Sequence, residues 1–570
     1  MLGEMLKRSD AGQPLWLPDV RDAFRMSDGV PLVLRLSSFD GETRDFRHVL
    51  PRWESPAERA LVRDYLCASI HNMLSACGGY ELVIFIDPEE TEAAKLLDEL
   101  PALFQLAERK RSGLGKVVSI ADRMGRAFGR GAFRFERTDI RYYAPVRRIS
   151  REAAPVAERL RALCAEAEHL NIVGVDVGGT DIKLTAAARG RLVAVKEYDW
   201  NPAAFSTVDQ IIEPILLLTR LMRACIASDG ADEGLARALR RDVPDAEIAA
   251  AVAGAEKRFD TGVLDAVGVS FPDIVLGDCI VGGETPKTDG VRRNGSVDYE
   301  AEFARLGALR DVLLPLCRGK GRCRIVNDGN MAAFTAAAEL ACGGAPELIG
   351  RGVVAHSLGT DLGTGWLMED GTIPQMPLEL YDLLLDLGAG PASRFPAEDL
   401  RSTRNENSGL ADARRYLGQS AAYRLAWRFD HSLLDGFTEE RDGVLRIRTE
   451  PDDLRKPCLE HLMRRAEDGD DAAEEVFRQI GRSFAVVSRE MRYLLAPETD
   501  TRFLFGRFVK SERCFTLLRE GCAESMPSLR LENGGDGLAE TPLMRQLASR
   551  RDVTVAQFAQ AVGALYYALT

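Results

Sequence analysis

Two segments of the chain repeat one pattern at an offset of 180 residues. Residues 172–197 and 352–374 each read as an apolar strand, a Gly-rich turn and a second strand. In the alignment of the two segments, turn residues 179–182 (GTDI) fall on 359–362 (GTDL). A strand-turn-strand unit repeated at this distance predicts a duplicated α/β domain with one hairpin in each copy.

The turns of these two hairpins have the composition of phosphate-binding loops. Glycine lets backbone N–H groups approach a phosphate because no Cβ intervenes, and threonine adds a hydroxyl donor. Two such hairpins facing each other across a cleft would bind a polyphosphate from both sides. For either hairpin alone an ordinary β-turn is the alternative, but their matching register favours a shared function.

Several sequence blocks carry a family resemblance. In order, they are 176–183 (DVGGTDIK), 267–272 (VGVSFP), 325–333 (IVNDGNMAA) and 358–365 (LGTDLGTG), with weaker matches at 503–507 (FLFGR) and 560–564 (QAVGA). They resemble motifs of the ROK family of sugar kinases and sugar-responsive repressors, within the actin-like ATPase and sugar kinase superfamily. The resemblance covers residues 171–570, although Asp273 stands where the family usually has Gly.

This resemblance implies an α/β fold with a duplicated, ribonuclease-H-like (actin-like ATPase) core of two lobes around a cleft, preceded by an extra N-terminal α/β domain. We place the N-terminal domain and its connecting helix at 1–165. The first lobe, at 171–345, would hold the first hairpin, the acceptor site and the catalytic Asp. The second lobe, at 346–570, would hold the second hairpin and the nucleotide-base region.

The resemblance also implies site residues for an ATP- and Mg²⁺-dependent kinase. Asp328 would be the general base that accepts the proton of the attacking hydroxyl, and Asn327 would orient the sugar. Asp176 would lie near Mg²⁺ and its waters, because a hard cation prefers carboxylate and phosphate oxygens. The other nucleotide-binding residues would be Gly178, Gly179, Thr180, Lys183, Gly359, Thr360, Gly363 and Gly506. Taken alone, Asp328 reads as part of a helix N-cap; its place in the block order favours catalysis.

The region that reads the sugar departs from the family pattern. Family members carry the motif G-E-x-G-H followed by a Cys-rich loop that binds zinc. In this chain Glu379 would take the role of the motif's Glu, and Asp382 stands in place of its His. No cluster of cysteines follows, so we expect no zinc. Glu284 and Asn294 are further candidate sugar contacts, in a polar stretch with Lys287, Arg292 and Arg293. That stretch suggests an acidic or phosphorylated acceptor, with a solvated loop as the alternative.

The leading function is therefore ATP-dependent phosphoryl transfer to a hydroxyl of a sugar or sugar derivative, as in a glucokinase-like sugar kinase. A catalytically weak or inactive sugar- or nucleotide-binding regulator is the alternative, and a structural actin-like ATPase is a third possibility. The Asn-Asp turn and the V-S-x-P block favour a kinase over the structural ATPase. The N-terminal segment lacks a helix-turn-helix pattern, which disfavours a DNA-binding repressor.

Charge and composition restrict the partners further. The formal net charge of -13 argues against general affinity for nucleic acids or anionic membranes. No apolar run approaches the length of a membrane span and the N-terminus has no signal-peptide pattern, so we expect a cytoplasmic protein. The eleven cysteines never form C-x-x-C, which predicts reduced, mostly buried thiols. Insertions at 204–260 and 397–470 are typical of lids or dimer contacts, and we expect a homo-oligomer, a dimer.

The N-terminal segment has patterns of its own. Residues 30–39 and 80–87 predict strands, and 56–77 predicts a helix capped by Ser55. Residues 111–150 interleave basic and aromatic side chains, which is typical either of a solvated strand face or of a surface for an acidic partner. The stretch 111–119 (RSGLGKVVS) lacks the glycine and the Ser/Thr that a phosphate loop needs.

Overall fold

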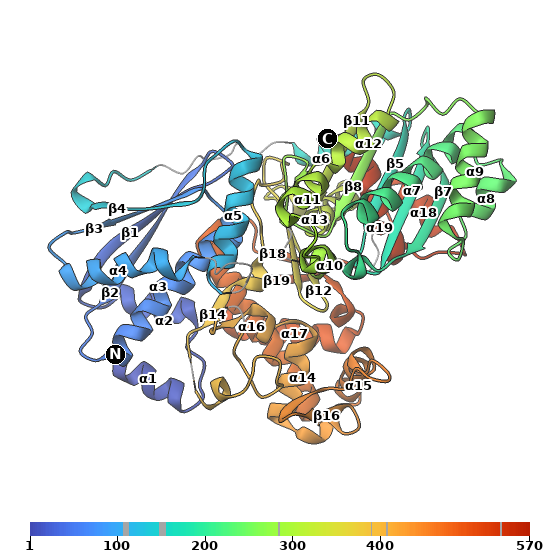
Figure 1. Cartoon of the computed structure of the whole chain (residues 1–570). Coiled ribbons are helices and arrows are strands. Elements are labelled where there is room, and N and C mark those ends of the chain that lie inside the picture. Colours follow the sequence, from blue (N-terminus) through green and yellow to red (C-terminus); the bar gives the residue numbers. More distant parts are fainter. Residues whose placement is uncertain (106–112, 147–154, 283–284, 389, 406–407, 536–538) are drawn as a thin grey trace. The chain divides into compact units, whose positions relative to one another are not determined.

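The computed structural model describes residues 1–105, 113–146, 155–282, 285–388, 390–405, 408–535 and 539–570 (Figure 1). The chain is a mixed α/β protein that divides into two compact units. Unit 1 comprises Met1–Ser150, His356–Thr364 and Met376–Asn533, and unit 2 comprises Arg151–Ala355, Gly365–Gln375 and Gly534–Thr570.

Unit 1 contains two four-stranded sheets, in the orders β2-β1-β3-β4 and β13-β12-β18-β19. Its helices are α1 (Leu2–Asp10), α2 (Leu17–Arg25), α3 (Pro56–Cys77), α4 (Thr91–Leu103), α5 (Gly115–Ala127), α14 (Gly418–Phe429), α15 (Arg455–Glu467), α16 (Asp471–Leu495) and α17 (Glu512–Ser525). Its strands are β1 (Gly29–Ser37), β2 (Thr43–Pro51), β3 (Glu81–Ile86), β4 (Arg134–Asp139), β14 (Leu384–Asp386), β15 (Ala411–Asp412), β16 (Thr438–Arg441), β17 (Val444–Ile447), β18 (Thr501–Gly506) and β19 (Arg530–Asn533), with parts of β12 (Val353–Leu358) and β13 (Leu362–Leu367).

Unit 2 is built on one five-stranded sheet, in the order β11-β8-β5-β6-β7. Its strands are β5 (Asn171–Val177), β6 (Asp181–Ala188), β7 (Arg191–Asp199), β8 (Ala266–Phe271), β9 (Val275–Leu276), β10 (Cys279–Ile280) and β11 (Arg322–Asn327). Its helices are α6 (Val156–Ala167), α7 (Asp209–Ala227), α8 (Glu233–Ala238), α9 (Asp245–Arg258), α10 (Asp289–Arg293), α11 (Tyr299–Gly307), α12 (Leu309–Leu313), α13 (Asp328–Gly343), α18 (Pro542–Ala548) and α19 (Val555–Tyr567).

The N-terminal patterns in the sequence are confirmed where they were clearest. Strands β1 and β3 match the predicted 30–39 and 80–87, and α3 begins after Ser55 as expected. The Ser55 hydroxyl accepts from the Glu58 backbone N–H, and the Glu58 carboxylate accepts from Ser55 in return, which is a capping box. Helices α1 and α2 and strand β2 were not predicted.

Residues 1–150 belong to the same compact unit as 376–533, a division that differs from the predicted boundaries at 165 and 346. Buried polar contacts within unit 1 account for it. The Asn72 side chain donates to the Leu384 carbonyl at 3.0 Å and accepts from the Leu384 N–H at 2.7 Å. Arg21 and Glu490 form an ion pair at 2.7 Å whose side chains are 3% and 0% exposed. The three domains expected from the sequence, at 1–165, 171–345 and 346–570, therefore remain a prediction, and the two compact units have other boundaries.

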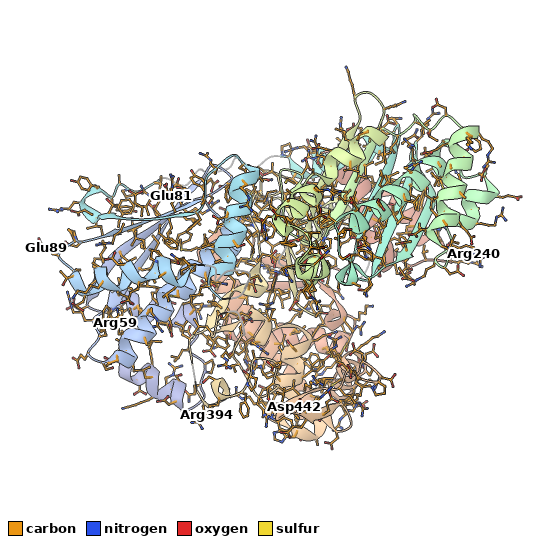
Figure 2. All side chains as sticks on the ribbon, viewed as in Figure 1. Arg59, Glu81, Glu89, Arg240, Arg394 and Asp442 are labelled. Atoms are coloured by element: carbon orange, nitrogen blue, oxygen red, sulfur yellow. The ribbon has the colours of Figure 1, made fainter. Side chains whose placement is uncertain are left out.

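The basic stretch of the N-terminal segment forms part of an edge strand. β4 pairs in parallel with β3, and Arg134 forms an ion pair with Glu81 at 2.7 Å (Figure 2 labels Glu81). Arg141 likewise pairs with Asp139 at 2.5 Å. β4 thus has the features of a solvated strand face, whereas Lys116 and Arg123 of α5, in the same stretch, are buried. An acidic partner stays a prediction. All eleven cysteines are free thiols and most are buried, as expected.

In unit 2, two faces of the sheet are covered by different helices. Because successive side chains of a strand point to opposite faces, Val173 and Val175 of β5 face the apolar cluster that includes α7 and α9. The other face of β5, which carries Gly174, lies against α19 (Figure 1). Asp176 follows Gly174 by two residues, so its side chain is on the α19 face.

The approach of α19 to the sheet is unusually close at two glycines. A Cβ on Gly174 would lie 2.0 Å from the Ala561 carbonyl oxygen, and a Cβ on Gly268 would lie 1.9 Å from the Ala564 carbonyl oxygen. Any side chain at these two positions would push the helix away from the strands. Glycine is therefore required for the position of α19.

We predict that Gly268→Ala destabilises unit 2, by about 1–3 kcal/mol or more, because the added methyl group meets the backbone of α19. Urea unfolding followed by far-ultraviolet circular dichroism would measure the loss. Gly319→Ala is the matched control, since a Cβ there meets no described atom within 4 Å. Equal stability of the two variants would show that the helix moves at little cost.

Candidate active site

Three parallel strands of unit 2 bring predicted site residues to one edge of the sheet. β8 pairs in parallel with both β5 and β11, so the carboxyl ends of all three strands lie together. Asp176 is in register with Ser270, and Ser270 is in register with Val326. Asp328 follows Val326 by two residues, at the first position of α13. The sheet thus brings Asp176 and Asp328 into one neighbourhood.

Asp176 is a carboxyl group in an environment that disfavours its charge. Burial raises the pKa of Asp176 to about 6, against the opposing influence of the Ser270 hydroxyl and the Lys183 ammonium. The negative charge of Asp328 raises this pKa further. Because the charge of Asp328 adds to the cost of ionising Asp176, a divalent cation bound here would favour the ionised form of Asp176.

Asp328 is the predicted general base. Burial raises its pKa, whereas the Lys287 ammonium and the backbone N–H of Gly329 act in the opposite direction. That N–H donates to the Asp328 Oδ1 at 2.8 Å, which fixes the orientation of the carboxyl group. Asp328 as a whole residue is only partly buried. A carboxylate with a raised pKa and a fixed orientation has the properties of a general base.

Asn327, predicted to orient the sugar, is the N-cap of α13. Its side-chain oxygen accepts from the N–H groups of Gly329 at 2.9 Å and Asn330 at 3.4 Å. Its side-chain nitrogen donates to the Asp273 carbonyl at 2.9 Å. The side chain therefore holds the helix that carries Asp328, and contact with a sugar stays a prediction.

The first hairpin turn needs glycine at Gly178. Its N–H donates to the Asp181 carbonyl at 2.8 Å, and a Cβ on Gly178 would lie 2.7 Å from that same oxygen. The Trp200 indole N–H donates to the Gly178 carbonyl at 3.0 Å and supports the turn from β7's end. Gly179 and Thr180 are exposed at its tip. Lys183 forms an ion pair with Asp181, two residues earlier on β6.

The second hairpin lies in unit 1, with Gly506 against it. Gly506 has φ of 104°, and a Cβ there would lie 2.3 Å from the Leu358 carbonyl oxygen. The carbonyl of Gly359 accepts from the Gln419 N–H at 3.0 Å. A Cβ on Gly359 would meet no described atom within 4 Å, so the protein's own packing does not demand glycine there. Thr360 is exposed in the turn, and Gly363 lies on β13 opposite Ser357.

Asp382, which replaces the family's His, belongs to a buried ion-pair network in unit 1. Lys116 of α5 pairs with Asp382 at 2.8 Å, and Arg414 pairs with the same carboxylate at 2.5 Å. Burial alone would raise the pKa of Asp382, but these two cations lower it to about 2. Asp382 is therefore a charged structural residue that fastens α5 to the segment after the second hairpin.

The other predicted sugar contacts have different outcomes. Glu379 donates its N–H to the Ser75 carbonyl at 3.0 Å and lies beside Tyr381 in unit 1. Asn294 donates to the Ser206 carbonyl at 2.9 Å and accepts from the Ser296 hydroxyl at 2.7 Å, so it holds two loops together. Glu284 lies outside the described residues. A sugar-binding role stays a prediction for all three.

Four residues near the site escaped the sequence analysis as site candidates. Ser270 lies in a recognised block, and its hydroxyl is 3.1 Å from the Gln560 side-chain oxygen. Trp200 and Lys287 both line a cavity of about 10 Å³ that also borders Phe271. The position of Ser270 at a strand end was the available signal. Nothing in the sequence placed Trp200, Lys287 or Gln560 beside Asp328's strand.

The donor set fits a magnesium–nucleotide complex at this edge of unit 2. In the described ranges there is no cluster of three or more His, Cys, Asp or Glu side chains that would hold a metal ion. Asp176 alone would contact Mg²⁺ or its waters, with phosphate oxygens completing the coordination, as Mg²⁺ commonly requires. The expectation that the chain lacks zinc stays a prediction. None of the helices in the described ranges combines the length and apolar character needed to cross a bilayer.

Comparisons with known proteins give matches only among solved structures. No family model matches the chain, and no curated protein matches it. The ROK hexokinase of Thermus thermophilus is 17% identical, with a TM-score of 0.40 over 70% of this chain and 98% of that chain. The structures that this chain resembles include ROK family kinases.

Two further solved structures are similar to this chain. The ROK family glucokinase of Streptomyces griseus, in complex with glucose and AMPPNP, is 17% identical, with a TM-score of 0.36 over 70% of this chain and 99% of that chain. The glucokinase of Balamuthia mandrillaris in complex with glucose is 12% identical, with a TM-score of 0.41 over 72% of this chain and 99% of that chain. The Thermus thermophilus and Streptomyces griseus proteins belong to the family that the sequence motifs resemble, but at such values none of the three structures assigns an activity to this chain.

We predict that Asp176→Asn stabilises the metal-free protein at pH 7.5 by about 2–3 kcal/mol. The folded-state pKa is raised, so between pH 4 and 6 the folded protein binds more protons than the unfolded chain, and wild-type stability falls as pH rises through that window. The variant lacks this fall. Urea unfolding in EDTA at pH 4, 5, 6 and 7.5 would measure it, with the exposed Asp311→Asn as control. A stability difference that does not grow with pH would contradict the assignment.

We predict that Lys116→Met destabilises unit 1 by about 3 kcal/mol, because it leaves Asp382 buried with one cation fewer. Lys95→Met is the matched control, since Lys95 and its partner Glu92 are 68% and 70% exposed and such pairs contribute little. Urea unfolding of both variants would measure the difference. If Lys116→Met were as stable as Lys95→Met, the ion-pair network would not hold α5 in place.

Proposed function

We propose that the chain is an ATP-dependent kinase that transfers a phosphoryl group to a hydroxyl of a sugar or sugar derivative. The observation that carries the proposal is the meeting of Asp176, Ser270 and the Asn327–Asp328 turn at the carboxyl ends of three parallel strands, beside the Gly178–Gly179 turn. Ligands of parallel α/β sheets bind at such an edge.

The sheet orders support the finer description of the fold as two ribonuclease-H-like copies. In unit 2 the order is β7-β6-β5-β8-β11, and in unit 1 it is β13-β12-β18-β19. Each sheet contains a glycine hairpin whose first strand also pairs with a later strand, β8 in one case and β18 in the other. We propose that the two sheets are the two domain copies that the sequence repeat predicts. Residues 1–150 would then be an addition to the second copy.

Asp328 would act as the general base in this reaction. Its carboxylate would accept the proton of the acceptor hydroxyl while that oxygen attacks the transferred phosphorus. The Gly329 N–H and the N-cap Asn327 hold the carboxyl group in one orientation, so no reorganisation is needed at the moment of transfer. Bound Mg²⁺ would supply charge neutralisation at the phosphates.

The first hairpin would position the phosphates. Its exposed tip at Gly179 and Thr180 offers backbone N–H groups and a hydroxyl, which are the donors that phosphate oxygens need. Lys183 lies on the adjacent strand, directly opposite Asp176 in the register. Its ion pair with Asp181 would open, or widen, when phosphate competes for the ammonium. In the second copy, Gly359, Thr360 and Gly363 are proposed as residues of a second phosphate-binding turn, and Gly506 as a residue of the nucleotide-base region.

We predict that Asp328→Asn lowers kcat by about 10²-fold or more, since the variant keeps the shape but loses the base. ADP release from MgATP would be measured across hexoses, amino sugars and acidic sugars. Asp311→Asn, an exposed carboxyl of the same unit, is the control and is expected to match the wild type.

The outcome also decides between the kinase and the regulator. Sugar-dependent turnover that depends on Asp328 supports the kinase and identifies its acceptor class. Binding of ATP or a sugar without turnover for any acceptor would refute the kinase and favour a regulatory protein that has kept the binding site.

A further inference from the structure

Lys287 lies near both the tip of the first hairpin and Asp328 in unit 2. It belongs to a short 3-10 helix, η3 (Pro286–Thr288), and its ammonium donates to the Pro272 carbonyl at 3.3 Å. Farther back along the side chain, its Cε lies 3.5 Å from the point that a Cβ on Gly179 would occupy. The side chain therefore rests on the tip of the first hairpin.

The same ammonium acts on the proposed general base. Lys287 lowers the pKa of Asp328, against the larger effect of burial. In the same neighbourhood, Lys183 of β6 lowers the pKa of Asp176 and the charge of Asp328 raises it. Lys287 is thus a cation placed beside the hairpin tip and beside Asp328 at once.

Other cations of this region have carboxylate partners. Arg292 pairs with Asp289 at 2.7 Å, and Arg293 pairs with the same carboxylate. Lys183 pairs with Asp181. For Lys287, no ion pair is found with any carboxylate of the described residues, a set that excludes Glu284. Its charge is directed to a backbone carbonyl, which is a weak partner for an ammonium group.

The position matters because the transferred group must pass between these two points. If the proposed function holds, the terminal phosphate of ATP lies at the hairpin tip and the acceptor hydroxyl lies at Asp328. We propose that Lys287 is a catalytic residue that contacts the terminal phosphoryl group of the nucleotide during its transfer. A fixed ammonium there stabilises charge on the phosphoryl oxygens, most strongly where that charge is concentrated.

Lys287 takes no part in the proton transfer that accompanies phosphoryl transfer. The acceptor O–H bond breaks and its proton goes to Asp328; an oxygen–phosphorus bond forms to the acceptor, and the bond between the bridging oxygen and the terminal phosphorus breaks to release ADP. Lys287 keeps its proton throughout. Its contribution is electrostatic and requires no co-reactant.

An anionic group on the acceptor is the other ligand that a lysine here would suit. The contact of the Lys287 Cε with the hairpin tip favours the phosphoryl group, because an acceptor-binding lysine would extend away from the nucleotide side. Arg292 and Arg293, which the sequence grouped with Lys287, are matched by Asp289 and give the acceptor no further support.

The test compares two nucleotides that differ in the terminal phosphate. Isothermal titration calorimetry would measure the binding of AMPPNP and of ADP, each with Mg²⁺, to wild type, Lys287→Met, Lys287→Arg and Lys320→Met. Lys320 is an exposed lysine in the turn before β11 and serves as the matched control. We expect Lys287→Met to weaken AMPPNP binding about tenfold or more and to change ADP binding less than twofold. Lys287→Arg should retain most of the AMPPNP affinity.

Each other outcome has one meaning. If Lys287→Met binds AMPPNP as tightly as the wild type, or loses AMPPNP and ADP affinity equally, the contact with the terminal phosphate is refuted while the kinase proposal stands. If the wild type itself does not prefer AMPPNP over ADP, the contact is refuted as well. If the wild type binds neither nucleotide, the proposed function itself fails, and the Asp328→Asn assay would show this independently.

Discussion

The close contact between α19 and the central strands of unit 2 determines where the site can be. Gly174 and Gly268 have no side chain, so the carbonyls of Ala561 and Ala564 reach the strands directly. Two residues farther along each strand, Asp176 and Ser270 lie on that same face and at the sheet edge. The last helix of the chain thereby covers the sheet face that carries Asp176 and Ser270. Burial raises the pKa of Asp176 on this face.

Buried charged groups also determine the packing of unit 1. Glu490 is fully buried and is paired with Arg21, and Asp382 is buried between Lys116 and Arg414. Charges in such places are tolerated only when they are paired, because an unpaired buried charge is costly. The Arg21–Glu490 and Lys116–Asp382 pairs each join a residue from the first 150 to a residue beyond 376. The N-terminal segment is therefore part of the architecture around the second hairpin.

The sequence predicted those features that local patterns determine. Ser55 and Glu58 form a capping box from residues three apart, and the hairpin with Gly178 has the glycine that its turn requires. Strand β2 was missed because its buried Arg44 reads as a surface residue until Asp40 and Glu42 are seen to pair with it. Lys116 and Lys287 were missed as partners of Asp382 and Asp328 for a related reason: long-range pairing leaves no periodic signal. The sequence identified Asn327 as a site residue, but it could not distinguish capping of α13 from contact with a sugar, because the same residue at the same position serves either role.

The ion-pair network around Asp382 restricts how the N-terminal segment and the rest of the chain can evolve. The 400 residues from 171 onward match the extent of the resemblance to ROK kinases, which suggests a detachable core with an optional extension. Lys116 contradicts that view, because a carboxylate in the core depends on a cation in the extension. Loss of the extension would leave Glu490 without Arg21 and Asp382 with Arg414 but without Lys116, so a change on one side restricts what the other side tolerates. The two stretches are thus expected to co-evolve as one unit of descent.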